Sequence, residues 1–159
     1  MALDLSLALK GARRVVVMGV GNDMRADDAA GVDVVRRLRA RLSSPRVRLI
    51  EAGVVPENFT ADIIRFEPSH VVLIDAADLG LEPGEVALVD PKTIVGESIS
   101  THRLPLSILI KYLRERVDTN IVFIGIQPAS RTMGAVMSER IKKAVDEVAD
   151  TLFEKLISF

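Results

Sequence analysis

The sequence predicts one α/β domain, built on a mostly parallel five-stranded sheet with helices on both faces. With 159 residues, 48% of them hydrophobic and 27% charged, the chain has the size and balance of one globular domain. Hydrophobic runs rich in β-branched residues alternate along it with segments of helical periodicity. Residues 1–12 are expected to form an N-terminal extension, and residues 13–159 the domain. No repeat or long linker interrupts the pattern.

The first half of the chain predicts two strand-and-helix pairs. Residues 14–20 form a hydrophobic run that is typical of a strand buried on both faces. Residues 27–42 follow as an amphipathic helix with arginines on its outer side. A short strand at 47–51 and a helix at 56–66, which has a proline in its first turn, form the second pair.

The second half predicts three further strands and two helices. A third buried strand, at 70–75, is followed after only nine residues by a fourth at 85–90. A parallel crossover needs about a dozen residues or more, so the fourth strand is expected to be antiparallel and at an edge. A helix at 105–117, a fifth strand at 121–126 and a helix at 138–156 complete the domain.

Composition excludes several classes of function. The chain has no cysteine, which rules out disulfides, thiolate metal sites and a cysteine nucleophile and suits a cytoplasmic location. A net charge of −1 gives no overall attraction to nucleic acid or anionic lipid. No hydrophobic run is long enough to span a membrane, and the first residues lack the basic region of a signal peptide.

The loop after the first strand begins like a dinucleotide-binding loop, but the pattern fails. Met24 stands where the third glycine of that motif is required, and no phosphate-binding Gly-Lys-Ser/Thr follows. Gly19 and Gly21 are expected to let the backbone turn sharply and lie close to a bound group. Asn22 is expected to brace the loop through its side-chain amide.

Three polar residues fall where a parallel sheet binds ligands, just past the carboxyl ends of its strands. Asp27 and Asp28 stand where the helix begins, so one of them is expected to cap it. The other, taken as Asp28, is then expected to point toward the sheet edge. Asp75 closes the third buried strand, and His102 lies in a polar loop before a helix. The second histidine, His70, begins a strand at the opposite end and is expected to be structural.

Two carboxylates and an imidazole suit a divalent metal such as zinc, nickel or manganese. Three protein ligands leave coordination positions open, as a reactive site requires. The motifs H-E-x-x-H and G-x-S-x-G are absent, so the common metalloprotease and serine hydrolase arrangements are not expected.

At these residues the chain resembles the nickel-iron hydrogenase maturation endopeptidases. The resemblance covers roughly residues 14–156, and its markers are GVGNDMRADDAAG at 19–31, VLIDAADLGLEPGE at 72–85, STHRLPL at 100–106 and FIGIQP at 123–128. The pieces LGLEPGE, THRLPL and GIQP look most like the branch that serves formate-hydrogenlyase-type hydrogenases. The order and spacing of the four segments carry the likeness.

The resemblance implies a three-layer α/β sandwich and a peptidase that trims the C-terminal extension of the hydrogenase large-subunit precursor after nickel insertion. It implies that Asp28, Asp75 and His102 are both the catalytic and the metal-binding residues. The enzyme would hold no tightly bound cofactor. Nickel would come from the substrate, although other divalent metals could occupy the site. The implied partners are the precursor and, as a further candidate, its maturation chaperone.

One segment departs from the family pattern. Many relatives carry Asp-Gly-Gly-Thr after the second strand, where this chain has Glu51-Ala52-Gly53-Val54. Glu51 is expected to keep the acidic role, while Val54 lacks the threonine hydroxyl. Asn58 and Gln127 are expected to line the cleft.

The chemistry and two rival functions stay open from the sequence. Either the metal polarises the carbonyl or a water, or a carboxylate acts as general base. The first rival is a conventional hydrolase that uses the same three residues to hold its own zinc or manganese. The second is a nickel-sensing chaperone module that binds the precursor without cutting it.

Overall fold

Five strands form one sheet in the order β2-β1-β3-β5-β4, in a computed structural model that describes residues 3–95 and 104–159. The strands are β1 (Val15–Val20), β2 (Val47–Gly53), β3 (His70–Ala76), β4 (Val86–Val89) and β5 (Asn120–Ile126). β1 pairs in parallel with both β2 and β3, and β3 pairs in parallel with β5. β4 runs antiparallel to β5 at the sheet edge, as expected from its short connection.

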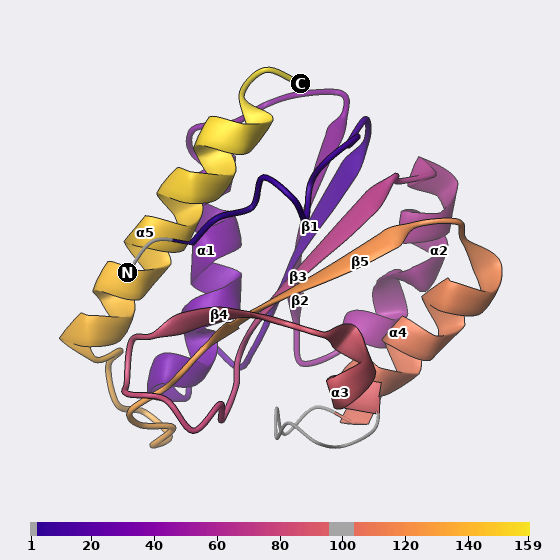
Figure 1. Ribbon diagram of the computed structural model, residues 1–159. Helices are drawn as coiled ribbons and strands as arrows, with labels where there is room; N and C mark the ends of the chain where they lie inside the picture. The colour runs from indigo at the N-terminus through magenta and orange to yellow at the C-terminus, as the bar shows by residue number, and fades with distance from the viewer. Residues whose placement is uncertain (1–2, 96–103) are drawn as a thin grey trace.

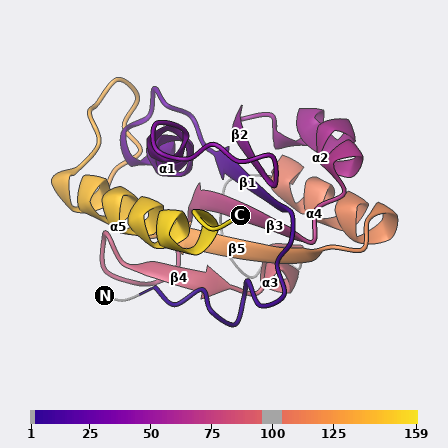
Figure 2. The same cartoon turned by 90° about the horizontal axis from the view of Figure 1, so that it is seen from above.

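Helices cover both faces of the sheet, which makes the three layers visible in Figures 1 and 2. The first face carries α1 (Ala30–Arg39) and α5 (Glu139–Leu156). The second carries α2 (Thr60–Phe66), α3 (Pro91–Val95) and α4 (Leu104–Arg116). Two single turns of 3₁₀ helix, η1 (Ala26–Ala29) and η2 (Pro56–Phe59), lead into α1 and α2.

The two central strands contribute side chains to both cores. Alternate residues of a strand point to opposite faces, so Val15 and Val17 of β1 pack under α1 and α5, while Val16 and Met18 pack under α2 and α4. All of β1 and all of β3 are buried. A strand covered on both faces has no solvent side, which is why its sequence is a continuous hydrophobic run.

The predicted α/β fold is confirmed, with local differences at the helices. The predicted helix at 27–42 begins as the 3₁₀ turn η1 and ends as α1 at Arg39. The short helix α3 was not predicted, because five residues are too few to display a hydrophobic period. In the N-terminal extension, Leu5 and Leu9 are buried in the core under α5. No helix within the described ranges is long and apolar enough to cross a membrane.

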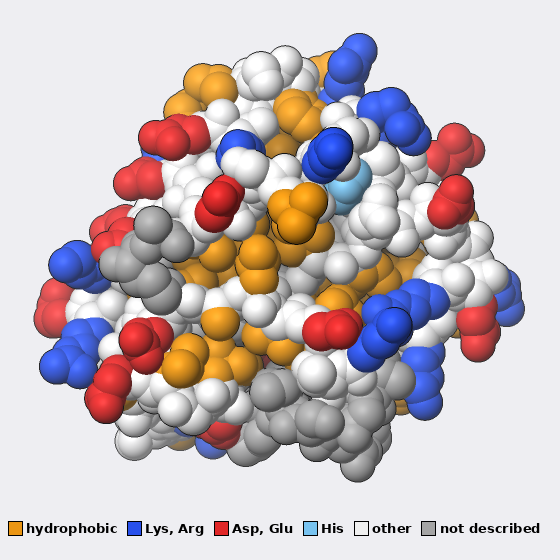
Figure 3. Space-filling view, viewed as in Figure 1, with side chains coloured by type: hydrophobic (Ala, Val, Ile, Leu, Met, Phe, Trp, Pro, Cys, Tyr) orange, Lys and Arg blue, Asp and Glu red, His pale blue; other side chains and the backbone are white. Residues whose placement is uncertain are grey.

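His70 lies at the amino end of the sheet, beside a cavity of about 440 Å³ that Leu88 of β4 also lines. Hydrophobic side chains are exposed on this side of the molecule (Figure 3). The Ser69 hydroxyl donates to the Arg14 carbonyl oxygen, and the ring Nδ1 of His70 lies 3.0 Å from Ser69 Oγ, within hydrogen-bond distance. Burial lowers the pKa of His70, and the charge of Arg13 lowers it further. These contacts fit the structural role expected of this histidine.

Candidate functional site

The candidate site lies at the carboxyl ends of two neighbouring parallel strands. Asp75 is the penultimate residue of β3, and Asp28 lies in η1, a short loop beyond the end of β1. β1 and β3 are hydrogen-bonded neighbours, with Gly19 opposite Ile74. Asp28 is only 2% exposed and Asp75 is fully buried. Buried carboxylates need compensating partners, so their placement at the ligand-binding end of the sheet favours a functional role.

Glycines bring η1 and α1 against the ends of these strands. A Cβ atom on Gly31 would lie 2.1 Å from the carbonyl oxygen of Ile74, and one on Gly21, whose φ is +147°, would lie 1.9 Å from that of Asp28. Gly19 is in equally close contact with the backbone of Gly31. The close approach expected at Gly19 and Gly21 is therefore made to the protein's own backbone. It sets Asp28 over the ends of β1 and β3.

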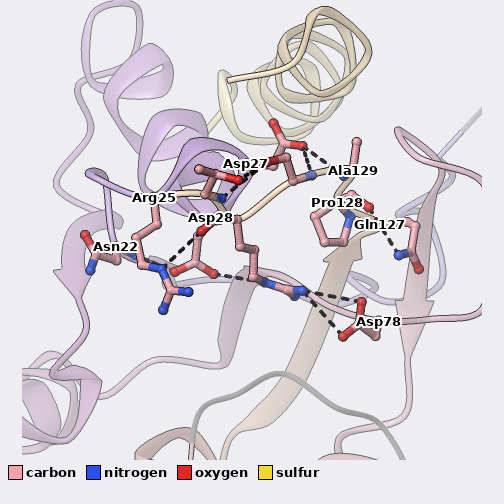
Figure 4. A network of polar contacts seen from close by, with 11 residues as sticks. Asn22, Arg25, Asp27, Asp28, Asp78, Gln127, Pro128 and Ala129 are labelled. Atoms are coloured by element: carbon pink, nitrogen blue, oxygen red, sulfur yellow. Dashed lines mark hydrogen bonds and ion pairs between the residues drawn. The ribbon is translucent and has the colours of Figure 1, made fainter. Parts of the chain in front are cut away.

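Asp28 is held by the loop that precedes it and by an arginine from elsewhere in the chain (Figure 4). The backbone N–H of Asn22 donates to Asp28 Oδ2 at 3.1 Å. The side chain of Asn22 accepts a hydrogen bond from the Met24 N–H at 2.9 Å, so it braces the loop as expected. Arg131 Nε lies 3.4 Å from Asp28 Oδ1.

The expectation that Asp27 or Asp28 caps the helix is wrong, because neither η1 nor α1 has a side-chain cap. The carboxylate of Asp27 instead fixes the loop between β5 and α5. It accepts hydrogen bonds from the N–H groups of Ala129, Ser130 and Ser138, at 2.7–2.8 Å, and from the Ser138 hydroxyl at 2.9 Å. A fully buried carboxylate is satisfied better by these four donors than by a helix end already packed on the sheet.

Asp75 belongs to the face of the sheet that α2 and α4 cover. Val71 and Leu73, which share its side of β3, both pack in that core. α4 begins at Leu104, on this same face. His102 lies outside the described residues. Within residues 3–95 and 104–159, no three histidine, aspartate or glutamate side chains gather closely enough to hold a metal ion.

Glu51, near the end of β2, takes part in a network of ion pairs. Arg36 contacts Glu51 at 2.7 Å and Asp23 at 2.8 Å, and Arg39 contacts Glu51 as well. The hydrogen bonds that Arg36 donates to Asp23 and to Glu51 raise the pKa of Arg36 above its ordinary value. Asp23, Arg36 and Glu51 line a cavity of about 360 Å³ that extends from Gly21 to Val54, beside the loop that holds Asp28.

Gln127 braces the loop that leaves β3. Its Oε1 accepts a hydrogen bond from the Leu79 N–H at 2.7 Å, and its Nε2 donates to the Pro128 carbonyl oxygen at 3.3 Å. Asn58, the other residue expected to line the cleft, is an exposed residue of η2.

Sequence reasoning missed Arg131. Its guanidinium bridges Asp28 and Asp78, with Nη1 3.4 Å from each carboxylate oxygen of Asp78. Arg131 lies in the loop that follows the parallel strand β5. The signal that located Asp28 and Asp75, a polar residue just past the carboxyl end of a parallel strand, could have located it too.

Comparison with known proteins gives one consistent family. The family described as hydrogenase maturation protease, HycI, matches residues 32–155. A putative hydrogenase maturation protease of Methanocaldococcus jannaschii is 36% identical over 153 residues, which cover 92% of this chain and 90% of that protein. The hydrogenase 3 maturation protease of Escherichia coli is also 36% identical, over 86% of this chain and 87% of its own length.

A solved structure gives the same answer for the fold. The crystal structure of the [NiFe] hydrogenase maturation protease HycI from Thermococcus kodakarensis KOD1 superimposes with a TM-score of 0.89 and 39% sequence identity. The superposition covers 96% of this chain and 97% of that one. Sequence and fold thus agree over nearly the whole chain, which belongs to the hydrogenase maturation protease family.

Proposed function

We propose that this peptidase removes the C-terminal extension of a nickel-iron hydrogenase large-subunit precursor after nickel has been inserted. The observation that carries the proposal is the pair of buried carboxylates, Asp28 and Asp75, at the carboxyl ends of neighbouring strands in a member of this family. The proposed role of the site is to recognise nickel that the precursor carries, with His102 as the third contact.

The chemistry of the two aspartates supports this role. Carboxylate oxygens are suitable ligands for a divalent metal whose other positions are filled by its carrier. Oδ1 of Asp28 lies 3.4 Å from Arg131 Nε, and the Asn22 N–H donates to Oδ2. The peptide beyond the nickel would then be positioned next to the carboxylates. Either the nickel polarises the scissile carbonyl, or Asp28 or Asp75 takes a proton from the attacking water.

The cavity beside the site supports a peptide substrate. It runs from the loop around Asn22 and Met24 to the end of β2 at Gly53 and Val54. Met24 and Val54 expose hydrophobic surface there. We propose that part of the precursor's extension lies in this cavity.

The direct test compares cleavage of nickel-loaded and nickel-free precursor by the purified full-length enzyme. The wild type should cut only the loaded form. Asp28→Asn and Asp75→Asn should each slow cleavage on the order of a hundredfold or more, because each removes a charged group from the reacting centre. Asp146→Asn is the matched control, since Asp146 is 57% exposed and pairs with Arg37 on the outer helices. Equal cleavage of both precursor forms by the wild type would refute nickel recognition.

Two further measurements separate the rival functions. Metal analysis of the purified enzyme should find no stoichiometric zinc or manganese, whereas a tightly held equivalent would favour the conventional metallohydrolase. Precursor binding and tail removal should be measured together. An enzyme that binds the loaded precursor and never releases the extension would favour the chaperone module.

A further inference from the structure

Arg131 occupies the candidate site without being held firmly in it. Its side chain is 18% exposed and lies between Asp28, which is almost fully buried, and Asp78, which is 46% exposed. The contacts to both carboxylates are 3.4 Å long, whereas charge-assisted hydrogen bonds between such groups are about 2.7–2.9 Å. The guanidinium Nε and Nη2 are buried and form no hydrogen bond with any residue that the structure describes. Arg131 therefore supplies charge to the site but has little directional bonding there.

The backbone that carries Arg131 is, by contrast, well fixed. The Asp27 carboxylate accepts hydrogen bonds from the N–H groups of Ala129 and Ser130, both at 2.8 Å. The Gly134 N–H donates to the Met24 carbonyl oxygen, also at 2.8 Å. These bonds lie on both sides of Arg131 in the loop. The side chain can thus change partner while its Cα atom stays in place.

We propose that Arg131 is the counter-cation of Asp28 in the free enzyme, and that the nickel of the precursor displaces it from Asp28 onto Asp78. The proposal rests on the proposed function in assigning Asp28 to the nickel. A guanidinium stays charged at every physiological pH, and a positive charge beside a buried carboxylate stabilises its ionised form. A divalent cation on Asp28 Oδ1 repels a guanidinium 3.4 Å from the same atom, whereas Asp78 remains within reach as an acceptor.

This arrangement makes Arg131 a specificity-determining residue. A free metal ion from solution must displace Arg131 from Asp28, and only the few bonds between that ion and the site favour the displacement. Nickel that arrives in the precursor is accompanied by the contacts between the two proteins, which help to offset that displacement. The enzyme thereby rejects free metal ions and accepts the metal that its substrate carries.

The test is the affinity of the full-length enzyme for free Ni²⁺ and Zn²⁺, measured by titration calorimetry. Arg131→Gln should bind these ions about tenfold more tightly than the wild type. Arg131→Lys, which keeps the charge but cannot bridge two carboxylates, should show a smaller increase of about threefold. Arg36→Gln is the control for loss of a nearby positive charge, because the ion-pair partners of Arg36 are Asp23 and Glu51. It should stay within about twofold of the wild type.

A second pair of variants tests whether the effect acts through Asp28. In the Asp28→Asn background, adding Arg131→Gln should change the metal affinity by less than about twofold. A gain that persists there, or an equal gain in Arg36→Gln, would overturn the proposal in favour of a general change in charge. Unchanged affinity in both Arg131 variants would overturn it as well. If Arg131→Gln does not fold, the comparison of Arg131→Lys with the wild type decides alone.

The proposed function and the Arg131 proposal fail separately. If the wild type cuts nickel-free precursor as fast as nickel-loaded precursor, nickel recognition fails, and the affinity comparison still decides the role of Arg131. If cleavage depends on nickel while free metal binds all variants equally, only the Arg131 proposal fails. Free Zn²⁺ should also inhibit cleavage of loaded precursor at about tenfold lower concentration in Arg131→Gln than in the wild type.

Discussion

The adjacent aspartates Asp27 and Asp28 are both buried, and replacing each in turn by asparagine separates a structural carboxylate from a functional one. Asp27 accepts four hydrogen bonds from the loop between β5 and α5. The contacts of Asp28 include a hydrogen bond from the backbone N–H of Asn22 and the 3.4 Å ion pair with Arg131. Because the two residues are neighbours of identical chemistry, each variant is the matched control for the other.

The cost of Asp27→Asn follows from the donors around it. An asparagine can keep its carbonyl oxygen at the position of Oδ2, which faces Ala129, Ser130 and the Ser138 hydroxyl. Its amide group then meets the Ser138 N–H, which loses its acceptor. Weakening three charge-assisted bonds by about 1 kcal/mol each and leaving one buried N–H unsatisfied lowers the free energy of unfolding by about 4 kcal/mol or slightly more. For a domain of this length that corresponds to a fall in Tm of about 12 °C.

Asp28→Asn should lower the free energy of unfolding less than Asp27→Asn does, and it should lower the rate of cleavage more. Its asparagine oxygen can still accept from the Asn22 N–H, and Arg131 keeps its contact with Asp78. We expect a loss of at most about 2 kcal/mol, together with the loss of cleavage described above. Asp27→Asn should retain measurable cleavage at a temperature at which it is folded.

Urea and thermal unfolding followed by far-ultraviolet circular dichroism suit this comparison, because the chain has no tryptophan and one tyrosine. Cleavage of nickel-loaded precursor provides the second readout. Equal destabilisation by Asp28→Asn and Asp27→Asn, or a wild-type unfolding temperature for Asp27→Asn, would refute the structural role of the Asp27 carboxylate.

Three further predictions follow from other parts of the structure. Gly31→Ala should lower the free energy of unfolding by about 3 kcal/mol or more in urea titrations, because the added Cβ atom would lie 2.1 Å from the Ile74 carbonyl oxygen. A variant as stable as the wild type would contradict this close packing of α1 on the sheet. Burial holds the pKa of folded His70 below its ordinary 6.5, so the unfolded chain binds more protons just below pH 6.5 and stability rises with pH through that window. The urea midpoint should therefore fall more between about pH 7.5 and pH 5 in the wild type than in His70→Gln, and equal falls would rule this out. Glu51→Gln should lower the free energy of unfolding by less than about 1 kcal/mol, and by less still at high salt, because the partners of Glu51 are half-exposed arginines. A large decrease that does not depend on salt would disprove this.

Much of the fold could be predicted because hydrophobic patterning reports burial directly. β1 and β3 are continuous hydrophobic runs because both faces of each strand are covered. α1 and α5 show a helical period of hydrophobic residues because only one face of each helix is buried. The antiparallel edge position of β4 followed from the length of one connection. The helix α3 was not predicted because five residues are too few to show a hydrophobic period.

The candidate site could be predicted only in part. Asp28 and Asp75 were located because parallel strands align their carboxyl ends at one edge. The different roles of Asp27 and Asp28 could not be predicted from the sequence. They depend on hydrogen-bond donors to Asp27 that lie more than a hundred residues away in the chain. His102 lies outside the described residues, so its place in the site stays a prediction.

The class of fold, the family and the edge of the sheet where the carboxylates lie follow from the amino-acid sequence, because periodicity, spacing and motif order are properties of the chain. Tertiary structure alone decided which aspartate fixes a loop, and that Arg131 and Asp78 join the site from distant segments. Hydrogen bonds and ion pairs act over about 3 Å and are indifferent to separation along the chain. Their partners therefore emerge only once the sheet has brought the ends of β1, β3 and β5 together.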